Sequence, residues 1–147
     1  MAEIEGLVRA LREGDDAAKT AAANALVKLS MENAVIKDMI VKAGGIPALV
    51  ELLRDGSVEA KQWAADALGN LARNNDANAL AIALAVGLEA FVELAQRGRV
   101  TVDGRSVVSN ASVPAKRKAA LVVAALLGDS VPDSAPRDIR AVIGSYL

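Results

Sequence analysis

The chain has 147 residues and a formal net charge of −1, and 53% of its residues are hydrophobic but only 2% aromatic. It contains no histidine and no cysteine, which removes the usual acid–base group near neutral pH, thiolate catalysis, disulfide bonds and most zinc sites. We therefore expect one domain that is not an enzyme and holds no metal or cofactor, with no overall field that attracts nucleic acid or a membrane.

Two kinds of segment with helical periodicity alternate along the chain. The first repeated segment occurs three times at steps of 42 residues, and each copy ends on a glycine: 4–14, 46–56 and 88–98. The second repeated segment follows each of them, with steps of 42 and 55 residues: 18–30, 60–72 and 115–127. Shorter helical patterns fill the remaining intervals: 32–45, 76–87 and 134–147. A repeat of 40 to 50 residues predicts a helical solenoid, and 13 extra residues enter its third copy.

The middle copies carry the clearest helix signals. Apolar residues recur at helical spacing from Ile46 to Leu53, with Pro47 in the first turn and Gly56 just beyond the end. Ser57 is a suitable N-cap for the helix that follows. Alanines in that helix let neighbouring helices approach closely.

The stretch VKAGGIPALVELLRDGSVEAKQWAADALGNLA (41–72) resembles an armadillo repeat, including the Gly-Gly-Ile-Pro joint and the A-L-x-N-L-A ending. The resemblance implies an all-α, right-handed α-solenoid with three helices per repeat; a generic HEAT-like bundle is the alternative. It divides the single domain into four parts, the third of which holds an insertion near 99–113: 1–31 as a partial repeat, 32–75 and 76–130 as repeats, and 131–147 as the helix of a further partial repeat or cap.

The resemblance also implies a concave groove, lined by the third helix of each repeat, in which an extended peptide binds. The second repeated segment corresponds to this third helix. The residues expected to face the groove are Asn24, Lys28, Trp63, Asp66, Asn70, Arg73 and Lys118. Asn70 matches the family's asparagine that bonds the peptide backbone, since a carboxamide both donates and accepts. The alternatives are that Asn70 is solvated or links two repeats.

The aromatic pattern differs from that of nuclear-import relatives. Those repeats place tryptophan four residues before the asparagine, where this chain has Asp66. Recognition of a basic localisation signal is therefore not supported. Trp63 lies one turn earlier, where it either anchors a partner or wedges against the neighbouring repeat.

The insertion alternates in the manner of strands around Asp103-Gly104, which is a strong hairpin signal. Arg99 and Arg105 flank this turn, within a larger basic cluster. Because a lone hairpin is marginally stable in water, it needs a surface to lie on. It is either a lobe that contacts an acidic partner or a tolerated surface insertion. The apolar helix at 120–127 requires a cover on its groove side, either segment 134–147 or a second chain.

The leading hypothesis is a non-enzymatic scaffold that binds an extended segment of another protein, without a small-molecule substrate, nucleic acid or membrane. A module that self-assembles through its repeat ends, or an oligomerising fragment of a larger armadillo protein, is the alternative, and an import-type adaptor ranks below both. The N-terminus lacks the pattern of a signal peptide. We therefore expect a cytoplasmic protein, with the nucleus as a second compartment.

Overall fold

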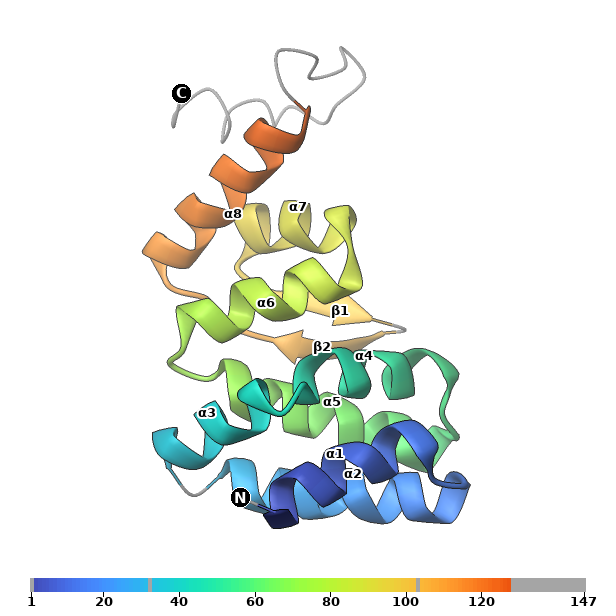
Figure 1. Ribbon diagram of the computed structural model, residues 1–147. Coiled ribbons are helices and arrows are strands. Elements are labelled where there is room, and N and C mark those ends of the chain that lie inside the picture. Colours follow the sequence, from blue (N-terminus) through green and yellow to red (C-terminus); the bar gives the residue numbers. More distant parts are fainter. Residues whose placement is uncertain (1, 32, 103, 128–147) are drawn as a thin grey trace.

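The computed structural model describes residues 2–31, 33–102 and 104–127, which form helices and one two-stranded hairpin (Figure 1). The helices of the first half of the chain are α1 (Ala2–Glu13), α2 (Asp16–Ser30), α3 (Ala34–Lys42), α4 (Gly45–Asp55) and α5 (Val58–Ala72). The remaining elements are α6 (Asp76–Val86), α7 (Leu88–Arg97), β1 (Val100–Val102), β2 (Arg105–Val108) and α8 (Val113–Leu127). The expected mostly helical fold with a hairpin insertion is confirmed.

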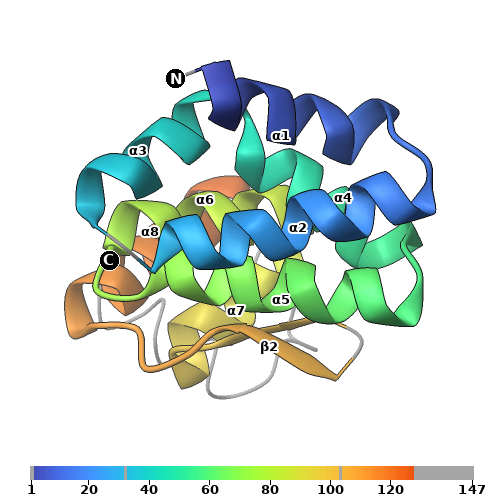
Figure 2. The same ribbon diagram turned by 90° about the horizontal axis from the view of Figure 1, so that it is seen from below.

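Corresponding helices of successive copies lie side by side. α2 packs against α5, and α1 packs against α4. Figure 2 shows α2 and α5 running next to each other, with α1 and α4 on the far side from the hairpin. In the first two copies, segments 42 residues apart in sequence are thus neighbours in space, as a helical repeat requires.

The helix ends follow from local chemistry. Ser57 caps α5, because its Oγ accepts a hydrogen bond from the backbone N–H of Ala60 at 3.1 Å. Asn75 caps α6 in the same way through Asn78 N–H. At the Gly-Gly joint, Gly44 has φ +89°, in the left-handed region that glycine adopts without strain.

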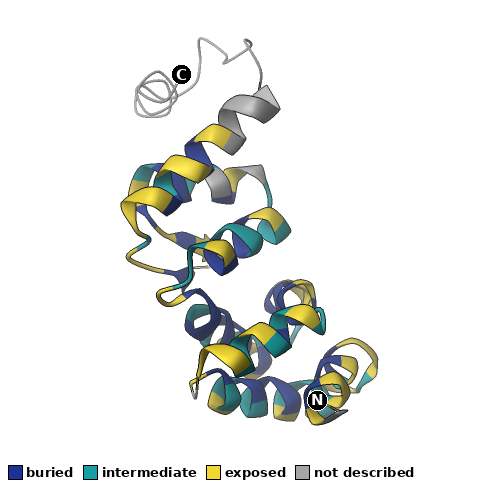
Figure 3. Cartoon of the chain, turned by 60° about the vertical axis from the view of Figure 1, so that its left-hand side comes forward, coloured by how far each residue is buried: buried dark blue, intermediate teal, exposed yellow. Residues whose placement is uncertain are grey.

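The core lies between two layers of helices, with α1 and α4 on one side and α2 and α5 on the other. Large aliphatic side chains are fully buried in it, namely Leu26, Ile40, Leu49, Leu53, Leu68, Leu71, Ile82 and Leu94. Small buried residues such as Ala23, Ala64 and Ala67 bring the helices close together. Figure 3 shows the same division, with buried faces turned toward neighbouring helices and exposed faces turned outward. Among the described residues, no helix is both long and apolar enough to cross a bilayer.

The hairpin is part of this core. β1 and β2 pair antiparallel, with Val102 opposite Arg105 and Thr101 opposite Ser106, and the register shifts beyond this pair. Gly104 in the turn has φ +74°. Three valines of the hairpin are buried within the same hydrophobic cluster as the helices: Val100 is 0%, Val107 0% and Val108 2% exposed. The hairpin therefore lies on the hydrophobic core, which provides the surface that a lone hairpin needs for stability.

The position of the hairpin changes the expected row of third helices. β2 packs along α5, whereas α8 packs against α6 and α7. In Figure 1 the two strands lie between the level of α5 and the level of α7. α2 and α5 form a continuous pair, but α8 does not extend that pair, because the strands occupy the side of α5 that a third helix would cover. The predicted cover of α8 by segment 134–147 lies outside the described residues.

Candidate functional site: a polar trough over α5

A hollow of about 700 Å³ runs over the outer face of α5. Its floor is α5, one wall is the end of α2, and the other wall is β2 with the segment that follows it. We call it the α5 trough, and its lining residues are Val27, Met31, Ala65, Asp66, Gly69, Asn70, Arg73, Asn74, Ser106, Ser109 and Asn110. Three of the expected groove residues, Asp66, Asn70 and Arg73, therefore meet in one concave site.

The other expected groove residues are distributed differently. Asn24 and Trp63 line a second hollow of about 470 Å³ between the first halves of α2 and α5. Lys28 is exposed on α2 and lines neither hollow. Lys118 is exposed on α8, on the far side of the hairpin from α2. Only α2 and α5 thus contribute to the face that the sequence assigned to three helices.

Asn70 is turned toward α2. Its exposed fraction is 9%, and its amide Nδ2 donates to the backbone carbonyl of Val27 at 3.2 Å and to Ser30 Oγ at 3.1 Å. Ser30 Oγ in turn donates to the Val27 carbonyl at 2.9 Å. Both N–H groups of the carboxamide are therefore engaged between the two helices. Only its oxygen is left for a ligand.

The remaining α5 residues of the site are more accessible. Asp66 accepts a hydrogen bond from Gln62 Nε2 at 3.2 Å, and Arg73 is exposed at the end of the helix. Trp63 is half-buried, packs against the core and also lines the second hollow. The α5 trough thus offers a carboxylate, a guanidinium and an amide oxygen along one helix, and Trp63 lies beside the second hollow on the same helix.

The hairpin carries a further hollow of about 540 Å³ on its outer face. We call it the hairpin hollow, and its lining residues are Arg97, Arg99, Thr101, Gly104, Ser106, Ser109 and Asn110. Two of the predicted insertion residues, Arg99 and Gly104, belong to it. Arg105 is half-buried opposite Val102, and Asp103 lies outside the described residues.

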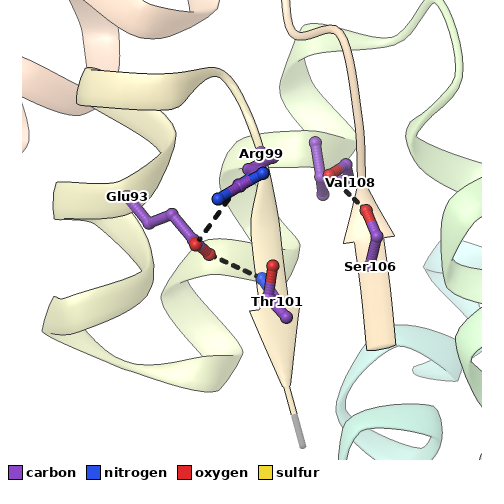
Figure 4. Close-up of polar contacts among 5 residues, drawn as sticks. All are labelled: Glu93, Arg99, Thr101, Ser106 and Val108. Carbon is purple, nitrogen blue, oxygen red and sulfur yellow. Dashed lines mark hydrogen bonds and ion pairs between the residues drawn. The ribbon is translucent and has the colours of Figure 1, made fainter. Parts of the chain in front are cut away.

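Glu93 on α7 positions this face of the hairpin (Figure 4). Its Oε1 accepts the backbone N–H of Thr101 at 2.7 Å, and its Oε2 lies 3.6 Å from Arg99 Nε. On the other strand, Ser106 Oγ donates to the Val108 carbonyl at 3.0 Å. The strands are therefore held on both sides, by the core beneath them and by α7 beside them.

Several lining residues have no signal in the sequence. Gly69 lies beside β2, where a Cβ built on it would be 3.9 Å from the Val107 carbonyl oxygen. Ser106, Ser109 and Asn110 are exposed polar residues whose importance depends on the hairpin lying against α5. Only the alternation of the insertion indicated that these residues are ordered at all.

A more apolar hollow of about 590 Å³ lies between α4 and α6, and its lining includes Pro47, Val50 and Leu84. A hydrogen bond from the Arg54 guanidinium to the Val86 carbonyl bridges the same two helices. Within residues 2–31, 33–102 and 104–127, no group of three or more acidic side chains is arranged to hold a metal ion.

Residues 33–73 match the family model described as Armadillo/beta-catenin-like repeat. The chain contains an armadillo repeat. The matched residues span α3, α4 and α5, so the α5 trough lies on the third helix of this armadillo repeat. Armadillo repeats generally mediate protein–protein interactions and are typically non-catalytic.

The fold is also similar to that of solved structures. Two crystal structures of engineered proteins superpose on 99% of this chain with TM-scores of 0.59 and 0.60, each at 23% sequence identity. The chain spans 61% and 41% of the length of those two proteins. No curated protein matches the sequence. At this identity, the likeness shows the fold alone.

Proposed function

We propose that this protein is a non-enzymatic interaction module that binds an extended segment of another protein in the α5 trough. The observation that carries the proposal is the concave polar site on the third helix of the armadillo repeat, where Asp66, Asn70 and Arg73 line one hollow together with β2. Extended segments suit such a site because their backbone groups are free to pair with side chains and with a strand edge.

The size of the trough limits how much of a partner it reads. From Ala65 to Arg73, the α5 residues that line the trough span about 12 Å at 1.5 Å per residue. An extended peptide covers that length with about four residues at 3.3 Å each. We therefore expect short recognition motifs and modest affinity.

Selection from a random peptide library, followed by titration of the selected peptides, tests this function directly. We expect enriched sequences that bind the purified chain with dissociation constants in the micromolar range or weaker. Absence of any enriched peptide, with the chain folded by circular dichroism, would contradict the proposal.

A substitution at Gly69 blocks the trough without removing a contact. Gly69→Phe places a ring among the lining residues. We expect it to lower the affinity for the selected peptides by at least about tenfold, equivalent to about 1.4 kcal/mol of binding free energy. Gly69→Ala is the matched control, because its Cβ meets only the Val107 carbonyl at an ordinary contact distance of 3.9 Å. The alanine variant should bind normally and unfold at a higher free energy, by about 0.5 to 1 kcal/mol. Equal binding by both variants would place the peptide elsewhere.

Self-assembly through the repeat ends is the alternative function. It would make the molar mass in solution rise with protein concentration, whereas peptide binding would not. Light scattering over a wide concentration range measures this molar mass directly. A constant monomer mass would exclude assembly, whereas growth of the mass with concentration, together with failure of the peptide selection, would favour it over peptide binding.

A further inference from the structure

The α5 trough and the hairpin hollow are two parts of one surface. Ser106, Ser109 and Asn110 line both of them. β2 and the residues after it therefore form a shared ridge, with α5 on one side and the outer face of the hairpin on the other. A segment bound in the trough would have side chains that reach over this ridge.

The hairpin hollow is lined by hydrogen-bond donors. Its side chains are two guanidinium groups, three hydroxyl groups and one carboxamide: Arg97, Arg99, Thr101, Ser106, Ser109 and Asn110. None of these lining residues is acidic. Guanidinium and hydroxyl donors together match the oxygens of carboxylates and phosphates.

The two arginines are arranged so that donors remain open. Arg99 directs its Nε toward Glu93, which leaves its terminal nitrogens available. Arg97 is exposed and has no ion-pair or hydrogen-bond partner among the residues that the structure describes. Glu93 is already engaged by Thr101 N–H and Arg99, so it balances one of the two positive charges.

The edge of β2 adds a backbone contact. Because Val102 and Arg105 close a two-residue turn, the next pair, Thr101 and Ser106, directs its backbone groups away from the partner strand. The N–H of Thr101 confirms this direction, since it points to Glu93. Ser106 N–H and C=O therefore face outward at the ridge, where an extended peptide backbone can pair with them.

We infer that the hairpin hollow recognises an anionic side chain of the segment bound in the α5 trough, so that the preferred partner is an acidic extended peptide. This inference rests on the proposed function and names its partner class. The shared chemistry is an oxyanion, carried either by aspartate and glutamate or by a phosphorylated residue. Arg73 at the end of the trough adds a third guanidinium, and Asp66 is the one acid among the residues that line the two hollows.

The test begins with the charge of the peptides. We expect the library-selected sequences to be enriched in aspartate and glutamate. Fluorescence anisotropy with labelled eight-residue peptides of aspartate and serine, phosphoserine and serine, asparagine and serine, or lysine and serine should then give binding of the first two only. The stronger of these two identifies the source of the oxyanion. Binding should weaken as salt rises from about 0.05 M to 0.5 M, because exposed charges are screened.

Arg97→Gln is the decisive variant, because Arg97 has no ion-pair or hydrogen-bond partner to lose among the residues that the structure describes. We expect about a tenfold loss of affinity for the acidic peptide, the effect of removing a charged hydrogen bond. Arg9→Gln removes the same charge from the exposed face of α1 and should leave affinity unchanged. Thermal unfolding should be the same for both variants.

The outcomes separate this inference from the proposed function. If the selected peptides are neutral or basic, bind in the trough and ignore Arg97→Gln, the inference is overturned and the proposed function stands. If no peptide of any charge is selected, the proposed function fails first. If an oligonucleotide competes with the acidic peptide at equal or higher affinity, the surface recognises polyanions in general and the inference of an acidic peptide is overturned.

Discussion

Val107→Asp is expected to unfold the chain or lower its free energy of unfolding by more than about 4 kcal/mol. Val107 is fully buried in the same cluster as α5 and α2, and an unpaired carboxylate there would lose its hydration without gaining a partner. Val107→Ala should cost about 2 kcal/mol through lost burial and a cavity. Urea denaturation followed by circular dichroism measures both values.

Ser109→Asp is the control for this prediction. Ser109 is exposed just after the same strand, so the substitution introduces the same negative charge at the surface. We expect it to change stability by no more than about 0.5 kcal/mol. If Val107→Asp were as mild as Ser109→Asp, the hairpin would be a detachable surface insertion, and the wall that it contributes to the trough would not be fixed.

Asn70→Ala is expected to lower the free energy of unfolding by about 1 to 3 kcal/mol. The substitution removes the hydrogen bonds to the Val27 carbonyl and to Ser30 Oγ, and these groups lie at the α2–α5 interface. Thermal or chemical denaturation tests the value. A residue that only reads a peptide would instead lower affinity and leave stability unchanged.

Asn24→Ala is the matched control for the asparagine. Asn24 is half-buried on α2, and its side chain has no hydrogen bond to any residue in the described part of the chain. Alanine favours the helix, so we expect stability to stay the same or rise by about 0.5 kcal/mol. Equal behaviour of the two variants would contradict the role of Asn70 as a link between helices.

The buried hairpin and the hydrogen bonds of Asn70 distinguish the molecule from a regular helical array. In such an array, third helices follow one another along the concave side. Here the hairpin covers the side of α5 that faces away from α2. On the side that faces α2, Asn70 donates a hydrogen bond to the Val27 carbonyl of α2. The binding surface that remains is short and runs along α5, which explains why we expect a short motif and why the hairpin decides its charge.

The sequence by itself determined the helices and the hairpin. Apolar spacing within a segment, the Ser57 cap and the Gly-Gly joint act through neighbours in the chain, and each appears in the structure where the pattern predicted it. The alternation around Asp103-Gly104 predicted the strands for the same reason. For the first two copies, the repeat of 42 residues also predicted which helices become neighbours, because equivalent faces bury against each other.

Only the tertiary structure decided what the candidate site is. Asn70 and Val27 are 43 residues apart in the chain, and no local pattern shows that the amide of one meets the carbonyl of the other. The position of β2 on α5 likewise depends on three valines that bury against helices far away in sequence. The trough, the ridge of Ser106 and the open arginines all follow from that packing. Local spacing therefore fixes which elements form, whereas burial between distant elements decides which of their side chains remain free to bind.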